Sequence, residues 1–270
     1  MTRSDFKTLI AHKPALIGMV HLPALPGSPK YRGDFEAIIR FAEKEAKTLY
    51  QAGFAGIMIE NLGDVPYFPE HVPNETIAAL AIIADRVKRN NKLPVGVNVL
   101  RNDAHAALAI AVAAQLAFVR VNILTGAAVT DQGLIQGRAH SLLRERQRLH
   151  GEHVAVLADI RVKHAEPLVQ RDLAQEVEEF FERALCSAII VTGTGSGKEV
   201  DCDFLMQVRA AAQGRPVLIG SGLRVENAAE LLALADGAIV GSSIKEDGLI
   251  QNPIARRRAE ELVKACRLIK

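Results

Sequence analysis

The chain has 270 residues, of which 49% are hydrophobic, and this length suffices for one large α/β barrel or two smaller domains. Its 33 basic and 31 acidic residues leave a net charge of +2, which excludes the concentrated basic surface of a nucleic-acid-binding protein. Three widely spaced cysteines without a CxxC pair indicate a reducing compartment, and the charged N-terminal segment predicts neither a signal peptide nor a membrane span. We therefore expect a cytoplasmic protein, with peripheral attachment to a membrane left open.

Short apolar runs alternate with amphipathic stretches along the chain. Each run is rich in β-branched residues and is typical of a strand buried on both faces of a parallel sheet. The predicted strands occupy residues 15–20, 55–60, 94–99, 117–122, 153–160, 187–192, 216–221 and 237–242. The predicted helices occupy residues 34–53, 74–90, 102–115, 138–150, 171–185, 201–214, 225–236 and 252–269.

The number of these units decides the expected architecture. Eight β/α units in strict alternation close a (β/α)8 barrel, whereas a doubly wound sheet usually has about five or six core strands. We find no linker, so we predict that residues 1–270 form a single (β/α)8 TIM barrel domain. The segment 123–137, after the fourth strand, is the longest loop candidate, and it predicts either a mobile lid or fixed packing at the barrel mouth.

The stretch GTGSGK at residues 193–198 invites comparison with a nucleotide-binding P-loop. A P-loop requires G-x-x-x-x-G-K-[ST], in which the hydroxyl holds Mg²⁺. With Gly197 and Lys198 in register, Thr192 stands at the first glycine and Glu199 at the hydroxyl position. A carboxylate there would repel phosphate, so the stretch favours a loop beside an anion site over a P-loop.

Two more glycine-serine loops follow the seventh and eighth strands, as GSG at 220–222 and GSS at 241–243. Barrels of this kind carry their site at the C-terminal ends of the strands, and these two loops frequently hold a phosphate group. Glycine lets the backbone approach the anion, and N–H and hydroxyl groups donate to it; the alternative is three ordinary tight turns. The predicted phosphate-binding residues are Gly193, Gly195, Gly220, Ser221, Gly222, Gly241 and Ser242.

Polar side chains also stand at the ends of the other predicted strands. They are His21, Glu60, Asn61, Asn98, Arg101, Asn102, Asp103, Arg120, Asn122, Asp159, Lys163 and His164, of which Asn102 or Asp103 could simply cap a helix. Strand interiors are ordinarily apolar, so this set indicates a ligand at the barrel mouth. Structural interpretations stay open beside it, because Arg120 could pair with a buried acid, either Glu60 or Asp159, and His21 could be a core histidine.

The set permits general acid-base chemistry, with Asp159 as the acid or base and Glu60 as its partner. The predicted catalytic residues are Asp159, Glu60, His21, Lys163 and His164. The predicted substrate-orienting residues are His21, Asn98, Arg120 and Asn122. A desolvated Lys163 could instead form a Schiff base, although it lies beyond the predicted strand end.

A divalent cation such as Mg²⁺ is a further candidate for this region, although no cofactor is firmly indicated. The residues that could hold it are His21, Glu60, Asp159 and His164. They are scattered in sequence and match no diagnostic metal-binding spacing.

Several of these segments carry a family resemblance. They are PALIGMVHLPALPGSP (14–29), GIMIEN (56–61), PVGVNVLRND (94–103), FVRVN (118–122), ADIRVKHA (158–165), VTGTGSG (191–197), GSGLRVENA (220–228) and DGAIVGSSIKEDG (236–248). Together they cover nearly the whole chain in order, and they resemble the BtpA/SgcQ family. The resemblance implies a barrel related to the ribulose-phosphate-binding barrels. It also implies a link to photosystem I biogenesis at the thylakoid surface, where the family's namesake acts.

Two functional hypotheses follow. The first is an enzyme, an isomerase, lyase or phosphohydrolase, that binds a small phosphorylated metabolite such as a sugar phosphate or a phosphorylated heterocycle. The second is a non-enzymatic assembly factor for a membrane protein complex, with the barrel as a scaffold. The polar residues at the strand ends favour the enzyme, because a scaffold has no need of them. Association into a homo-oligomer is expected from the barrel class alone.

Overall fold

The computed structural model describes residues 4–11, 13–193, 195 and 199–269, and its centre is a closed barrel of eight parallel strands. Around the barrel the strands follow the order β1-β11-β10-β9-β7-β4-β3-β2. They are β1 (Ala15–His21), β2 (Gly56–Glu60), β3 (Val95–Asn98), β4 (Phe118–Val121), β7 (Ala155–Ile160), β9 (Ala188–Val191), β10 (Val217–Ile219) and β11 (Gly237–Val240). All eight predicted strands are confirmed, and the fold is the predicted α/β barrel.

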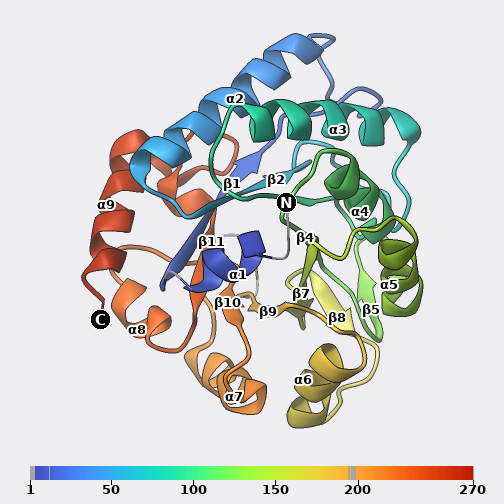
Figure 1. The fold of residues 1–270 in the computed structure, drawn as a ribbon, viewed down its shortest axis with the longest axis vertical. Coiled ribbons are helices and arrows are strands. Elements are labelled where there is room, and N and C mark those ends of the chain that lie inside the picture. Colours follow the sequence, from blue (N-terminus) through green and yellow to red (C-terminus); the bar gives the residue numbers. More distant parts are fainter. Residues whose placement is uncertain (1–3, 12, 194, 196–198, 270) are drawn as a thin grey trace.

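Helices surround the ring of strands, as Figure 1 shows. They are α2 (Phe35–Ala52), α3 (Asn74–Arg89), α4 (Ala104–Ala113), α5 (Ala139–Arg148), α6 (Leu173–Glu182), α7 (Cys202–Ala212), α8 (Ala228–Leu232) and α9 (Arg256–Arg267). The predicted cap signals of α2 are confirmed, since Asp34 accepts a hydrogen bond from the Ala37 N–H and Gly53 is left-handed at φ 90°. None of the helices in the described ranges combines the length and the apolar character needed to cross a membrane.

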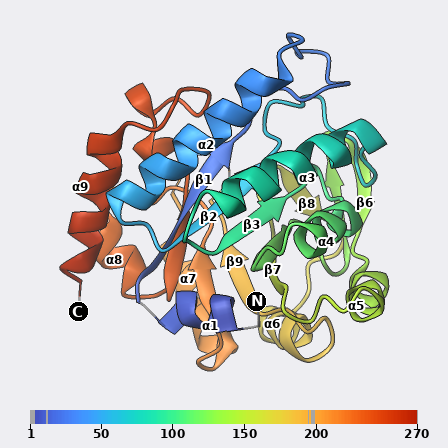
Figure 2. The same ribbon diagram turned by 45° about the horizontal axis from the view of Figure 1, so that its top comes forward.

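One helix precedes the barrel and is absent from the sequence prediction: α1 (Ser4–Ala11). It lies across one end of the barrel (Figures 1 and 2). Its Phe6 and Leu9 are buried in a cluster with Ala15 and Phe118, which open β1 and β4. The ring centroids of Phe6 and Phe118 are 6.3 Å apart. The helix therefore closes the N-terminal end of the barrel, opposite the end where the predicted site residues stand.

The barrel interior is filled with apolar side chains in layers. Successive residues of a strand point to opposite faces, so every second residue faces inward. The interior cluster includes Ile17, Met19, Met58, Phe118, Leu157, Ile190, Leu218 and Ile239. Gly96 on β3 makes room for one of them, because a Cβ at Gly96 would lie 2.1 Å from the ring of Phe118.

The segment 123–137 differs from the loop expected there. It contains β5 (Ala127–Thr130) and β6 (Gly133–Gln136), which pair as an antiparallel hairpin, and β5 also pairs with β8 (Ala165–Pro167). Ile123, Ala128, Ile135 and Val162 form a small core of their own under this sheet. The strands are short, and β8 comes about 30 residues later in the chain, so local periodicity gave no signal for the sheet.

A buried ion pair connects the two halves of the chain at the barrel seam. Lys245, between the short 3-10 helices η1 (Ser242–Ile244) and η2 (Glu246–Gly248), places its Nζ 2.5 Å from Oε2 of Glu45 on α2. The Ile254 N–H also donates to Glu45 Oε1 at 2.9 Å. Both charged side chains are almost wholly buried, so this contact fixes the loop after β11 against α2.

The packing around Gly96 yields a first prediction. We expect Gly96→Ala to lower the free energy of unfolding by about 1–3 kcal/mol, because the methyl group would collide with Phe118 in a close-packed interior. Urea denaturation followed by circular dichroism measures the loss. The double variant Gly96→Ala/Phe118→Leu should recover part of it, whereas an unchanged midpoint for Gly96→Ala alone would refute the packing argument.

Candidate active site

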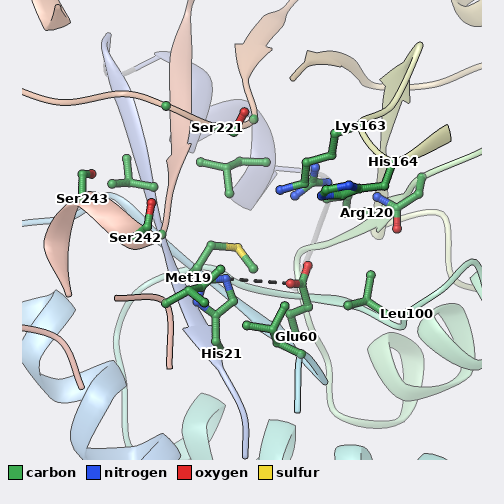
Figure 3. Close-up of a pocket in the computed structure, with 18 of the residues that line it drawn as sticks. Met19, His21, Glu60, Leu100, Arg120, Lys163, His164, Ser221, Ser242 and Ser243 are labelled. Atoms are coloured by element: carbon green, nitrogen blue, oxygen red, sulfur yellow. Dashed lines mark ion pairs between the residues drawn. The ribbon is translucent and has the colours of Figure 1, made fainter. Parts of the chain in front are cut away.

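A cavity of about 580 Å³ opens at the C-terminal ends of the barrel strands, and Figure 3 shows side chains that line it. The sequence-predicted residues that line it are His21, Glu60, Arg120, Asn122, Lys163, His164, Gly220, Ser221, Gly222, Gly241 and Ser242. Asn98 and Asp159 do not line it, but they bind side chains that do. Gly193 and Gly195, after β9, lie outside its lining.

Sequence reasoning missed part of the lining. The missed residues are Met19, Leu62, Tyr67, Leu100, Asp131, Leu223, Ile239, Val240 and Ile250, whereas Arg101 and Ser243 were named at the strand ends but were given no role. Arg101 carried a signal, since it is a basic residue that follows directly on a buried strand. Asp131 carried none, because it reaches the cavity only through the hairpin that the sequence did not reveal.

Four of the polar residues form one row across adjacent strands. Strand pairing aligns His21 with Glu60, Glu60 with Asn98, and Asn98 with Arg120. They come two positions after Met19, Met58, Gly96 and Phe118, respectively. Because successive residues of a strand point to opposite faces, all four side chains point into the barrel, each two residues beyond an interior position of its strand. The site thus lies at the C-terminal end of the barrel interior.

Arg120 and Asp159 form a buried, two-pronged ion pair. Arg120 donates from Nε to Oδ2 at 2.9 Å and from Nη2 to Oδ1 at 2.8 Å, and Asn122 Nδ2 donates to the same Oδ2 at 2.7 Å. Burial acts to lower the pKa of Arg120, but attraction to Asp159 outweighs it and the pKa is raised. Of the two acids that the sequence offered as partners of Arg120, Asp159 is the one that binds it. Its carboxylate is occupied with holding Arg120 and Asn122.

Glu60 is a carboxylate that lines the cavity. Asn98 Nδ2 donates to its Oε2 at 2.7 Å, which leaves Oε1 directed toward His21 Nε2 at 3.8 Å (Figure 3). Both Glu60 and His21 are more than nine-tenths buried. A carboxylate beside an imidazole in a sheltered cavity is a pair that can take a proton from a ligand and return it.

His21 is held in its neutral form. Burial, and after it the positive charges of Lys245, Lys163 and Arg120, place the pKa of His21 well below 6.5. Its Nδ1 is buried without a hydrogen-bond partner among the described residues. A neutral imidazole can donate from one nitrogen and accept at the other, so His21 can serve a ligand in either role.

Arg101 and Lys163 are basic residues that line the cavity, and neither forms an ion pair with a carboxylate among the described residues. Arg101 is 5% exposed, and its Nη2 donates to the Lys163 carbonyl oxygen at 2.8 Å, while its Nε is buried with no acceptor in the described ranges. Burial lowers the pKa of Arg101, and burial followed by the charge of Arg120 lowers the pKa of Lys163. A bound anion would offset this cost of burial by supplying the charged partner that neither side chain has among the described residues.

Two glycines leave the cavity open on the other side. A Cβ at Gly220 would lie 2.5 Å from the Ile190 side chain, and a Cβ at Gly241 would lie 2.8 Å from the ring of His21. Both positions come two residues after interior side chains, Leu218 and Ile239, and both line the cavity. The side chains beside both glycines pack too closely for a Cβ, so only glycine fits at these two positions of the cavity lining.

The loop after β9 lies beside this site. The Gly193 N–H donates to Ser221 Oγ at 2.9 Å, which ties the β9 loop to the β10 loop. Of the GTGSGK stretch, Thr194, Ser196, Gly197 and Lys198 lie outside the described residues. The expected role of this stretch as a flank of an anion site therefore stays a prediction.

The described residues do not form a set of ligands for the divalent cation that the sequence suggested. In the part of the chain that the structure describes, no three His, Cys, Asp or Glu side chains are grouped so as to hold a metal ion. His21 and Glu60 lie together, but Asp159 is bound to Arg120. A requirement for Mg²⁺ stays a prediction from sequence.

Comparison with known proteins gives a family match over nearly the whole chain. A model of the BtpA family matches residues 12–267. A relative from Thermococcus kodakarensis, described as an uncharacterized protein, is 46% identical over 92% of this chain and 94% of its own. The Photosystem I biogenesis protein BtpA of Synechocystis sp. is 44% identical over 96% of this chain and 90% of its own.

Solved structures resemble the chain in fold. The thiamine phosphate pyrophosphorylase from Pyrococcus furiosus aligns with a TM-score of 0.58 at 12% identity, over 95% of this chain and 96% of its own. A 3-hexulose-6-phosphate synthase aligns with a TM-score of 0.59 at 15% identity, over 93% of this chain and 99% of its own. At such low identity the likeness shows a shared barrel and nothing about the reaction.

The Arg120–Asp159 pair yields a prediction on stability. We expect Asp159→Ala to lower the free energy of unfolding by about 3–5 kcal/mol, because it leaves the Arg120 charge buried without its partner. Urea titration measures this. The double variant Arg120→Met/Asp159→Ala should be more stable than Asp159→Ala alone. Glu261→Ala, which removes the exposed partner of Arg257, serves as the control and should move the midpoint far less.

His21 yields a prediction on pH dependence. Its pKa is lower in the folded chain than the value of about 6.5 in the unfolded chain. Below about pH 6.5 the unfolded chain therefore binds one more proton, and stability is lost as the pH falls. We expect His21→Gln to reduce this loss by up to about 1.4 kcal/mol per pH unit. Urea titrations at pH 7, 6 and 5 test it, and parallel profiles for the two chains would show that His21 is not the group responsible.

Proposed function

The chain belongs to the BtpA family, and from this premise and the geometry of the barrel mouth we propose that it is an enzyme acting on a small phosphorylated metabolite. One observation carries the proposal: Glu60 and His21 face a single sheltered cavity whose lining also holds the glycine-serine loops after β10 and β11. A proton-transfer pair and an anion-binding rim in one cavity are what such a reaction requires.

The phosphate group binds at residues 220–222 and 241–243. These loops follow the seventh and eighth barrel strands in chain order, which is where barrels of this class commonly hold a phosphate. Glycine at 220, 222 and 241 lets the ligand approach the backbone, and Ser221, Ser242 and Ser243 supply hydroxyl donors. The barrel neighbours named for phosphorylated compounds support the proposal only through the shared fold.

Glu60 is the general acid or base, with His21 as its partner. Asn98 fixes one oxygen of Glu60 by a hydrogen bond, and the other stays available to the ligand. Asp159, which the sequence suggested for this role, instead positions Arg120 and Asn122, and these two line the cavity and orient the substrate. Proton transfer of this kind serves an isomerase or lyase, and equally a phosphohydrolase that activates water.

A second candidate function is assembly or stabilisation of a membrane protein complex. It is supported by the printed name of the Synechocystis relative. It is also supported by exposed apolar side chains on the small sheet and the residues after it, namely Val129, Leu134, Leu168 and Val169. In this case the barrel acts through its surface, as a peripheral or complex-bound factor, and its cavity binds no substrate.

A ligand panel distinguishes the two candidates. We expect one phosphorylated compound among sugar phosphates, phosphorylated heterocycles and nucleotides to raise the Tm selectively, measured with and without Mg²⁺. At about 100 times its Kd it should add about 2.7 kcal/mol of stability, which is about 5 °C for a chain of this size. A folded protein that responds to no compound would favour the assembly factor.

A matched variant separates binding from chemistry in the same experiment. Glu60→Gln retains an oxygen that accepts from Asn98, so the ligand should still raise the Tm. Conversion of that ligand, followed by NMR in D₂O to detect deuterium incorporation, should fall about 10²–10⁴-fold because the acid-base group is lost. Unchanged conversion by Glu60→Gln would remove Glu60 from the mechanism.

A further inference from the structure

The cavity has two different walls that face each other across the barrel mouth. In the closed order of eight strands, β10 stands opposite β3 and β11 opposite β4. The serine wall, on the loops after β10 and β11, consists of Ser221, Ser242 and Ser243. The cation wall consists of Arg101 after β3 and Lys163 after β7, the neighbour of β4. Figure 3 shows Ser242 and Ser243 across the cavity from Lys163.

The cation wall has unused hydrogen-bonding capacity. A guanidinium has five N–H donors, yet the side chain of Arg101 makes one hydrogen bond within the described chain, to the Lys163 carbonyl oxygen. Its Nε is buried and has no acceptor there. A buried donor without an acceptor is uncommon in folded proteins and calls for a specific explanation.

The nearby carboxylates do not explain this arrangement. Asp159 is taken up by Arg120 and Asn122. Glu60 and Asp131 line the same cavity, but within the described ranges neither lies at ion-pair distance from Arg101 or Lys163. The charge of Arg120 is thus paired with a carboxylate, whereas Arg101 and Lys163 have no such partner in the described part of the chain.

We propose that the ligand carries two acidic groups at opposite ends: a phosphate at the serine wall and a second acid, carboxylate or phosphate, at Arg101 and Lys163. The phosphate site at the serine wall rests on the proposed function, and the site for a second acidic group at the cation wall is the new part. The planar fork of Arg101 suits the two oxygens of either acid. Glu60 and His21 lie on β2 and β1, between the two walls in the ring, so they face the middle of a ligand that spans the mouth.

Three five-carbon probes test the second end, because they share a C5 phosphate and differ only at C1. They are ribose 5-phosphate, 5-phosphoribonate and ribose 1,5-bisphosphate. We expect calorimetry to show at least one of the two doubly acidic probes binding roughly ten- to a hundred-fold more tightly than ribose 5-phosphate, as for a hydrogen-bonded charge pair. Which of the two binds better identifies the second acid as carboxylate or phosphate.

Variants test which wall of the cavity binds which acidic group of the probe. Arg101→Met should abolish the advantage of the doubly acidic probe and leave ribose 5-phosphate within about threefold. Ser242→Ala/Ser243→Ala should weaken all three probes alike. Arg101→Gln provides a second variant if Arg101→Met does not fold. Equal affinity for all three probes, or an advantage that survives in a folded Arg101 variant, would overturn the proposal of a second acid site.

A measurement that does not depend on the carbon skeleton completes the test. Crystals of the full chain soaked in selenate should show two anomalous peaks in the cavity, one at each wall. A single peak at the serine wall would overturn the second site and leave the phosphate proposal standing. No peak at the serine wall, together with no binding of any probe, would overturn both.

Discussion

Arg120 places a full positive charge inside the barrel, and the rest of the site is arranged around the need to neutralise it. Its strand partner is Leu157, one layer below Asp159, so the long side chain extends diagonally to reach the carboxylate. An unpaired charge at this depth would be severely destabilising, and Asp159 therefore cannot be released for another role. This is why the proposed function assigns proton transfer to Glu60, whose Oε1 is directed toward His21 in the cavity.

The cavity itself follows from the same two-residue period. On one side of the barrel the positions above the apolar core hold long polar side chains, from His21 to Arg120. On the other side Gly220 and Gly241 come two residues after the interior side chains of Leu218 and Ile239. Neither position has room for a Cβ, and both line the cavity with backbone alone. A ligand therefore meets polar groups on one side and open backbone on the other.

The strands and the rim of the barrel could be predicted because they depend on local pattern. Short apolar runs identify buried strands, and the barrel fold then brings the polar residues at their C-terminal ends together at one rim. Helix α1 was not predicted because its eight residues carry too little periodicity. The β5–β6 hairpin was not predicted because β8, the strand that completes its sheet, lies far along the chain. Whether Arg120 pairs with Glu60 or Asp159 depends on strand register, which composition does not encode. Arg101 was visible after its strand, but its lack of a partner is a tertiary property.

The unsatisfied groups argue for a ligand more strongly than any motif does. His21 Nδ1 and Arg101 Nε are both buried without partners in the described chain, and each such group costs about 1–3 kcal/mol of stability. Apolar residues of similar size would avoid that cost, and a protein acting only through its surface would gain nothing from carrying them. Under the proposed function these groups have a use, because a bound substrate would supply the partners that the described chain does not.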